Sequence, residues 1–139
     1  MRASKHPLAY RLYRHDTGEM FYPDDLEAKG MSISPTGLPM FRGEPMLNST
    51  LSWFSGQLDH HKKPLFEGDI CKIGVVNEFG SLSEHYACMR YNHATHQFIL
   101  EFPSAIKGMQ YETRSCELVG DEFRNPELLS KVNGTNPQN

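Results

Sequence analysis

The stretch Glu67-Gly68-Asp69-Ile70 opens an apolar, β-branched run that continues to Val76, and it decides the fold. A Gly-Asp step before such a run is typical of a strand that starts at a sharp corner. Glycine permits the bend, and the aspartate side chain can accept hydrogen bonds from nearby backbone amides. We therefore expect a bent barrel strand here and assign structural roles to Glu67, Gly68 and Asp69.

Short apolar segments separated by turn residues lie on both sides of this corner. The segments with strand-like composition are 8–13, 20–22, 31–34, 51–55, 70–76, 85–91, 97–102 and 111–119. The first two predict an N-terminal β-hairpin, and 85–91 with 97–102 predict a second one around the turn 92–96. Many short strands joined by Gly- and Pro-containing turns predict a mostly β (α+β) domain rather than a helical bundle.

Two short segments favour helix instead. Residues 23–27 can form a single helical turn that Gly30 stops. Near the C-terminal end, Asn125 can cap a helix whose first residue is Pro126, so both receive structural roles. We expect residues 1–132 to form a single domain, because one core suffices for a chain of this length. The polar tail 133–139 is expected to be disordered.

Charge and cysteine content restrict the classes of function. Lys and Arg number 14 and Asp and Glu 17, for a net charge of −3, so the overall field repels nucleic acid and any such binding must be local. Three cysteines with no C-x-x-C spacing are typical of reduced, packed thiols, which indicates a cytoplasmic location. No apolar stretch approaches the ~20 residues that cross a bilayer, so no membrane association is expected.

Neither a catalytic nor a metal site is predicted. The sequence has no nucleophile elbow and no Gly-rich phosphate loop, and its carboxylate pairs fall at a predicted turn and at the corner. The best metal-ligand group is Cys88, His93 and His96, but a structural zinc site needs a fourth ligand, and solvated turn histidines are the simpler interpretation. We expect a protein without enzyme activity, cofactor or metal.

The candidate binding residues are His60, His61, Lys62, Lys63 and Trp53. The first four form the densest positive run in the chain. Three more side chains could join them in a phosphate-binding patch if the fold brings them together: Arg11, Arg14 and His15. Small barrels bind single-stranded nucleic acid through basic grooves and stacked aromatic rings, although aromatic residues in strands are more often part of the core.

Three segments, in their order, resemble the YopX family of small proteins carried by bacteriophages, prophages and other mobile elements. Residues 51–59 and 64–70 resemble the family's "tGLkDknGkeiyEGDiv" stretch, and residues 117–129 resemble its closing "evIGNiyeNPELL". The opening residues 10–13 and 18–23 resemble its amino-terminal part more loosely. The chain departs from the family pattern at residues 60–63, where an Asn-Gly turn is usual, and at Asp121, where Asn is usual.

The resemblance implies a small SH3-like β-barrel with an additional N-terminal β-hairpin and a short C-terminal helix, but no settled activity. We therefore expect a non-catalytic phage or mobile-element accessory protein that acts as a protein-binding module on a host or phage target in the host cell's cytoplasm. A homo-oligomer is compatible with this role. The alternative is a small-barrel nucleic-acid-binding protein.

Overall fold

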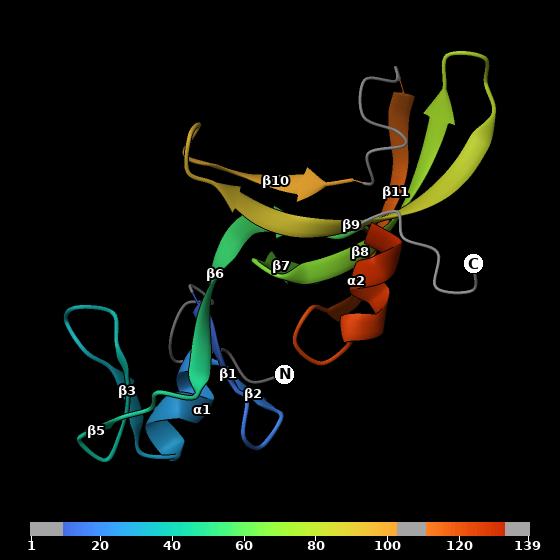
Figure 1. The fold of residues 1–139 in the computed structure, drawn as a ribbon. Coiled ribbons are helices and arrows are strands. Elements are labelled where there is room, and N and C mark those ends of the chain that lie inside the picture. Colours follow the sequence, from blue (N-terminus) through green and yellow to red (C-terminus); the bar gives the residue numbers. More distant parts are fainter. Residues whose placement is uncertain (1–9, 103–110, 133–139) are drawn as a thin grey trace. The chain divides into compact units, whose positions relative to one another are not determined.

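The computed structural model describes residues 10–102 and 111–132. Their contacts divide into two compact units, one ending at Phe54 and the other beginning at Ser55. Figure 1 shows the elements of both units. The predicted tail 133–139, the loop predicted between residues 103 and 110, and the first two residues of the predicted N-terminal strand lie outside the described residues. The single-domain organisation stays a prediction.

The first unit holds small antiparallel sheets and one short helix. Its elements are β1 (Tyr10–Arg14), β2 (Glu19–Phe21), α1 (Pro23–Ala28), β3 (Met31–Ile33), β4 (Pro39–Phe41), β5 (Glu44–Pro45) and the first part of β6 (Ser49–Leu58). Strand β1 pairs with both β2 and β6, while β3, β4 and β5 form a separate sheet. The predicted hairpin therefore corresponds to β1 and β2, and the predicted helical turn corresponds to α1.

Apolar side chains from β1, β2, α1 and β3 form the core of the first unit. They are Leu12, Phe21, Leu26 and Met31, with Tyr10, Phe41, Met46 and Leu51 packed around them. Because side chains alternate along a strand, Leu12 of β1 and its partner Phe21 of β2 lie on the same face of the sheet, where α1 contributes Leu26. Burial of this face holds α1 in place, since an isolated helix of this length is unstable in water.

The second unit is built on one larger antiparallel sheet. Its elements are the end of β6, β7 (Pro64–Phe66), β8 (Asp69–Asn77), β9 (Leu82–Asn92), β10 (Gln97–Glu101), β11 (Tyr111–Asp121) and α2 (Pro126–Val132). The strand order in the sheet is β10-β9-β8-β11. The chain is thus mostly β with a short C-terminal helix, as the sequence predicts, and β9 with β10 is the second predicted hairpin.

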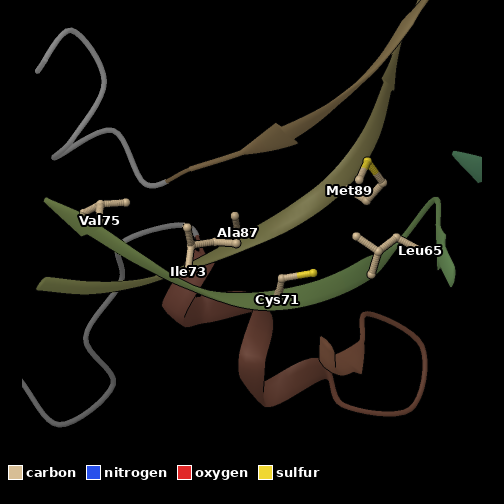
Figure 2. Packing of buried hydrophobic residues seen from close by; sticks show 6 residues of the cluster. All are labelled: Leu65, Cys71, Ile73, Val75, Ala87 and Met89. Carbon is tan, nitrogen blue, oxygen red and sulfur yellow. The ribbon is translucent and has the colours of Figure 1, made fainter. Parts of the chain in front are cut away.

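Strand β8 is buried on both faces, which explains its nearly continuous apolar sequence. One face carries Cys71, Ile73 and Val75, which pack with buried side chains of β7 and β9, as Figure 2 shows. The opposite face carries Ile70, which packs with Val132 of α2 and other neighbours. Helix α2 therefore covers the beginning of β8, and the sheet separates two apolar layers.

The corner before β8 depends on its glycine and its aspartate. Gly68 has a φ of +92°, a left-handed conformation that favours glycine. Its N–H donates to Met89 O at 2.8 Å and its carbonyl accepts from Glu122 N at 2.9 Å. Buried Asp69 accepts a hydrogen bond from Phe66 N through Oδ2 at 2.7 Å. The corner is thereby tied both to its own turn and to β9 and the chain beyond β11.

Strand β11 is irregular at two places along its pairing with β8. The register shifts between Thr113 and Ser115 and again between Leu118 and Gly120. Bulges of this kind increase the local twist of a strand, and they make an edge less suitable for pairing with another chain. In the described part of the chain, no helix is long and apolar enough to cross a membrane.

Candidate functional site

The predicted basic run forms the turn between β6 and β7, here called the basic turn (His60–Lys63). The side chain of Asp59, which is only 4% exposed, fixes the backbone of this turn. Its Oδ1 accepts hydrogen bonds from His61 N at 2.9 Å and from Lys63 N at 2.8 Å. The backbone of the turn is therefore fixed by one buried carboxylate.

The same carboxylate attaches the basic turn to β11. Asp59 Oδ2 accepts a hydrogen bond from Leu118 N at 2.9 Å, and His60 N donates to Cys116 O at 2.8 Å. These two contacts satisfy backbone groups along the edge of β11 that does not face β8. Burial alone would raise the pKa of Asp59, but hydrogen bonds from three backbone amides hold that pKa below its ordinary value.

The side chains of the basic turn are exposed, although His60 Nδ1 also accepts a hydrogen bond from Cys116 N at 3.3 Å. The His60 and His61 rings have their centroids 4.0 Å apart, and His61 Nε2 lies 3.9 Å from Glu117 Oε2. Lys62 has a φ of +66°, a conformation usually given to Gly or Asn, and both lysines are exposed. The turn thus presents two lysine ammonium groups on a rigid backbone, with Glu117 as a nearby acidic counterpart.

The other residues of the predicted patch belong to the first unit. Trp53 is 48% exposed, and its ring packs edge-on against that of Tyr10 at a centroid distance of 5.9 Å. Arg11 is only 2% exposed, so its predicted place in a surface patch is wrong: it occupies an interior position on β1. Arg14 is paired with Asp16 at 2.9 Å, and His15 Nε2 lies 2.7 Å from Thr50 Oγ1.

The histidines considered as metal ligands have local ring partners instead. Tyr91 contacts both of them: its ring lies edge-on to that of His93 at 4.8 Å, and its hydroxyl lies 3.3 Å from His96 Nδ1. Cys88 is buried within β9, where it packs near α2. Among residues 10–102 and 111–132, no group of three or more His, Cys, Asp or Glu side chains could hold a metal ion.

The residues given structural roles lie where backbone segments join. Half-buried Glu67 and buried Asp69 flank Gly68 at the corner, and Asp69 is paired in register with buried Asp121 of β11. Asn125, the residue before Pro126 and α2, accepts a hydrogen bond from Asp121 N through Oδ1 at 3.2 Å. Its side chain therefore closes the loop that leads into the helix.

Asp121 also has an ion-pair partner of its own. Its Oδ1 accepts hydrogen bonds from Phe123 N and Arg124 N, and its Oδ2 lies 2.7 Å from a guanidinium nitrogen of Arg124. A buried carboxylate that is engaged in this way holds a turn in shape. The carboxylates near the corner therefore have structural partners rather than the geometry of an acid–base pair.

Sequence reasoning missed one surface feature, here called the apolar tip (Phe79 and Leu82). Phe79 is 85% exposed and Leu82 70% exposed, at the end of the β8–β9 hairpin that extends past α2 in Figure 1. The hairpin turn is ordered by Asn77, whose Oδ1 accepts from Phe79 N at 2.9 Å and from Ser81 N at 3.0 Å. The sequence did contain a signal for this feature, namely the aromatic residue Phe79 inside a turn motif, where core packing does not require an aromatic side chain.

Comparisons with known proteins place these observations in a family. The family model for YopX protein matches residues 9–130. A crystal structure of protein EF1440 from Enterococcus faecalis is similar with a TM-score of 0.51 and 17% identity, covering 87% of this chain and 96% of that chain. At that identity the likeness shows the fold alone. A comparison with curated proteins found no match. Because the family model spans nearly the whole chain, the chain belongs to the YopX family.

Proposed function

We propose that this protein is a non-catalytic accessory protein of a phage or mobile element and that it binds a host or phage protein in the host cytoplasm. The observation that carries the proposal is the apolar tip, because Phe79 on the hydrogen-bonded turn and Leu82 at the start of β9 both expose most of their surface. Scattered exposed apolar residues are common, but two large ones on a protruding, fixed turn favour contact with another protein.

The energetics of such a contact support this reading. Full burial of a Phe or Leu side chain contributes about 1.5 to 3 kcal/mol. The Asn77 hydrogen bonds fix the turn before any partner arrives, so little ordering entropy is lost on binding. Polar neighbours, among them Glu78 and Ser81, are exposed around the two apolar side chains. An apolar centre with a polar surround is the usual anatomy of a binding hot spot.

We further propose that the strands of the second unit form a small SH3-like barrel that serves as a scaffold. In support, β8 is buried on both faces and β11 carries two register shifts that bend it along β8. On such a scaffold the turns between strands carry the binding residues, because the strands themselves are fixed by packing. The apolar tip and the basic turn are both of this kind.

The test is capture of partners from host lysate on the immobilised protein, followed by mass spectrometry. Substituting both Phe79→Ser and Leu82→Ser should remove the partner without changing the fold, as judged by circular dichroism. Leu58→Ser is a matched control, because Leu58 is also exposed but lies outside the hairpin. A partner that the double variant retains at unchanged affinity would contradict the role of the tip. Failure to recover any reproducible partner would contradict the function.

A nucleic-acid-binding role is the second candidate, and the basic turn is the observation that favours it. Lys62 and Lys63 are exposed on a turn whose backbone Asp59 fixes, so both positive side chains start from defined positions on the surface. Gel-shift measurements with single- and double-stranded DNA and RNA should then show binding that weakens steeply with salt. Lys62→Asn keeps a residue suited to the left-handed conformation while removing the charge. No binding at low salt would eliminate this candidate.

A further inference from the structure

Two of the three cysteines lie on one face of the sheet in the second unit. Cys71 of β8 is buried in the apolar cluster of Figure 2, and half-buried Cys116 of β11 packs against the same cluster. Cys116 is paired with Ile73, and Cys71 lies two residues before Ile73, so the three side chains share one face. The two cysteines are therefore diagonal neighbours across an antiparallel strand pair.

The third cysteine lies on the opposite face of the sheet. Cys88 of β9 is paired with Ile70 and belongs to the layer that packs with Val132 of α2. Its thiol donates to a backbone partner of its own, with Sγ 3.8 Å from Met89 O. The sheet therefore separates Cys88 from the other two thiols, and the fold brings together one specific pair.

The two thiols of this pair contact each other. Cys71 donates a hydrogen bond to the sulfur of Cys116, and this bond lowers the pKa of Cys116, although burial opposes the shift. The same bond, together with burial, raises the pKa of Cys71. Cys116 is also the more exposed of the two. One sulfur thus has the thiolate character and the access that favour oxidation, and the other is a buried thiol in a position to react with the product.

The chain around Cys116 can accommodate the shift that a bond between diagonal neighbours requires. Diagonal neighbours lie farther apart than directly opposite residues, and a disulfide needs its Cα atoms within about 7 Å. Register shifts lie on both sides of Cys116, between Thr113 and Ser115 and between Leu118 and Gly120. Because these irregularities interrupt the ladder, the short segment between them can adjust without unpairing the whole strand. A disulfide formed in this way is more easily reduced than an unstrained one.

We propose that Cys71 and Cys116 form a peroxide-sensitive dithiol, in which Cys116 is the site of oxidation and Cys71 resolves the product into an intramolecular disulfide. The Cys116 thiolate attacks one oxygen of hydrogen peroxide, the O–O bond breaks, and Cys116 becomes a sulfenic acid while hydroxide leaves. The Cys71 sulfur then attacks the Cys116 sulfur, the S–O bond breaks, and the Cys71 proton leaves with the oxygen as water. A thiol reductant restores both thiols. This site is separate from the apolar tip, and its test needs no binding partner.

Timed exposure of the full chain to hydrogen peroxide near neutral pH tests the proposal. Catalase stops the reaction, N-ethylmaleimide labels the remaining thiols in urea, and mass spectrometry counts the labels. We expect the three labels of the reduced protein to fall to one, on Cys88, with a cross-linked peptide that contains Cys71 and Cys116. Dithiothreitol should restore all three. The proposal would be overturned by an oxidised Cys116 that accumulates without the cross-link, by a cross-link to Cys88 in the folded protein, or by no oxidation at all.

Matched variants separate the two roles. Cys71→Ser should still form the Cys116 sulfenic acid, which dimedone traps, but no intramolecular disulfide. Cys116→Ser should slow the oxidation of Cys71 by at least about tenfold, because the remaining thiol is buried and its pKa is not lowered. Cys88→Ser is the control and should form the cross-link at the wild-type rate. Oxidation of Cys71 at the wild-type rate in Cys116→Ser would assign the first step to the wrong thiol and contradict the proposal.

The same oxidation in urea tests whether the fold selects the pair. Without the sheet, nothing separates Cys88 from the other two thiols, so we expect cross-links that contain Cys88 as well. Exclusive pairing of Cys71 with Cys116 in the unfolded chain would contradict a selection by the strand register.

Discussion

Asp59 Oδ2 accepts a hydrogen bond from Leu118 N at 2.9 Å, which joins two residues 59 positions apart in the sequence. Through this bond the turn between β6 and β7 closes part of the outer edge of β11. Open strand edges invite pairing with other chains, and a carboxylate that accepts an edge amide removes one such opportunity. The basic turn is thereby part of the second unit's structure as well as a surface feature.

Asp59→Asn should destabilise the protein. The asparagine amide keeps one oxygen acceptor. Its NH₂ group would face a backbone N–H that, in the wild type, donates to the second carboxylate oxygen. We expect a loss of about 2 to 3 kcal/mol in the free energy of unfolding, since hydrogen bonds to charged groups contribute about 1.5 to 3 kcal/mol each. Urea denaturation measures this loss. Asp16→Asn, at an exposed carboxylate paired with Arg14, is the control and should leave the urea midpoint nearly unchanged, because exposed ion pairs are screened by solvent.

The contribution of Asp59 should also depend on pH. Its pKa is lowered in the folded state, so the folded protein holds the carboxylate ionised where the unfolded chain has begun to bind protons. The stabilisation is therefore complete above the unfolded pKa of about 3.9, and it is lost as the pH falls through the lower folded value. The stability difference between wild type and Asp59→Asn should shrink below about pH 4. A difference that stays constant from neutral pH into this acid range would contradict the assignment.

Gly68→Ala should be more damaging than Gly80→Ala, although both glycines have positive φ. A Cβ on Gly68 would lie 2.7 Å from Glu122 Oε2, the oxygen that also lies 2.7 Å from Arg90 Nη1. A Cβ on Gly80 would meet nothing within 4 Å. Gly80→Ala, the control, should therefore lose only about 1 kcal/mol of stability through backbone strain. Gly68→Ala should lose at least about 2 kcal/mol.

Thermal and urea denaturation of the two variants would measure this comparison. Equal losses of stability would show that backbone conformation alone accounts for the requirement at the corner. A larger loss at Gly68 would show that the close approach of Glu122 contributes as well, because that side chain must shift and disturb its pairing with Arg90.

Local features of this fold could be predicted, because their causes are local in the sequence. The β9–β10 hairpin follows from two apolar runs around a turn, and α2 follows from the Asn125-Pro126 start signal. The bond from Leu118 to Asp59 could not be predicted in this way, because it depends on tertiary packing between distant segments.

The candidate sites show the same division. The positive charge of residues 60–63 is visible in the sequence, but the left-handed conformation of Lys62 is not. Arg11 is buried and Phe79 is exposed, and both placements oppose the usual preference of the residue type. The sequence therefore gave a wrong expectation of a surface position for Arg11, and it gave no expectation of a surface site at Phe79.

The three cysteines should differ sharply in reactivity. Cys116 is half-buried, and a hydrogen bond from Cys71 lowers its pKa, although burial opposes that shift. The same contact, together with burial, raises the pKa of Cys71. Burial raises the pKa of Cys88 to about 12. Because the thiolate is the reactive form, an alkylating reagent at pH 8 should modify Cys116 first.

Mass spectrometry of peptides after timed exposure to iodoacetamide would identify the modified thiol. We expect one fast-reacting cysteine in the folded protein and three after unfolding in urea. Cys116→Ser should abolish the fast phase, whereas Cys88→Ser should leave it unchanged, because Cys88 lies within the layer packed against α2. Modification of Cys88 as fast as Cys116 in the folded protein would require α2 to detach readily from the sheet. That result would contradict the packing of Cys88 with Ile70 and Val132 as the dominant state in solution.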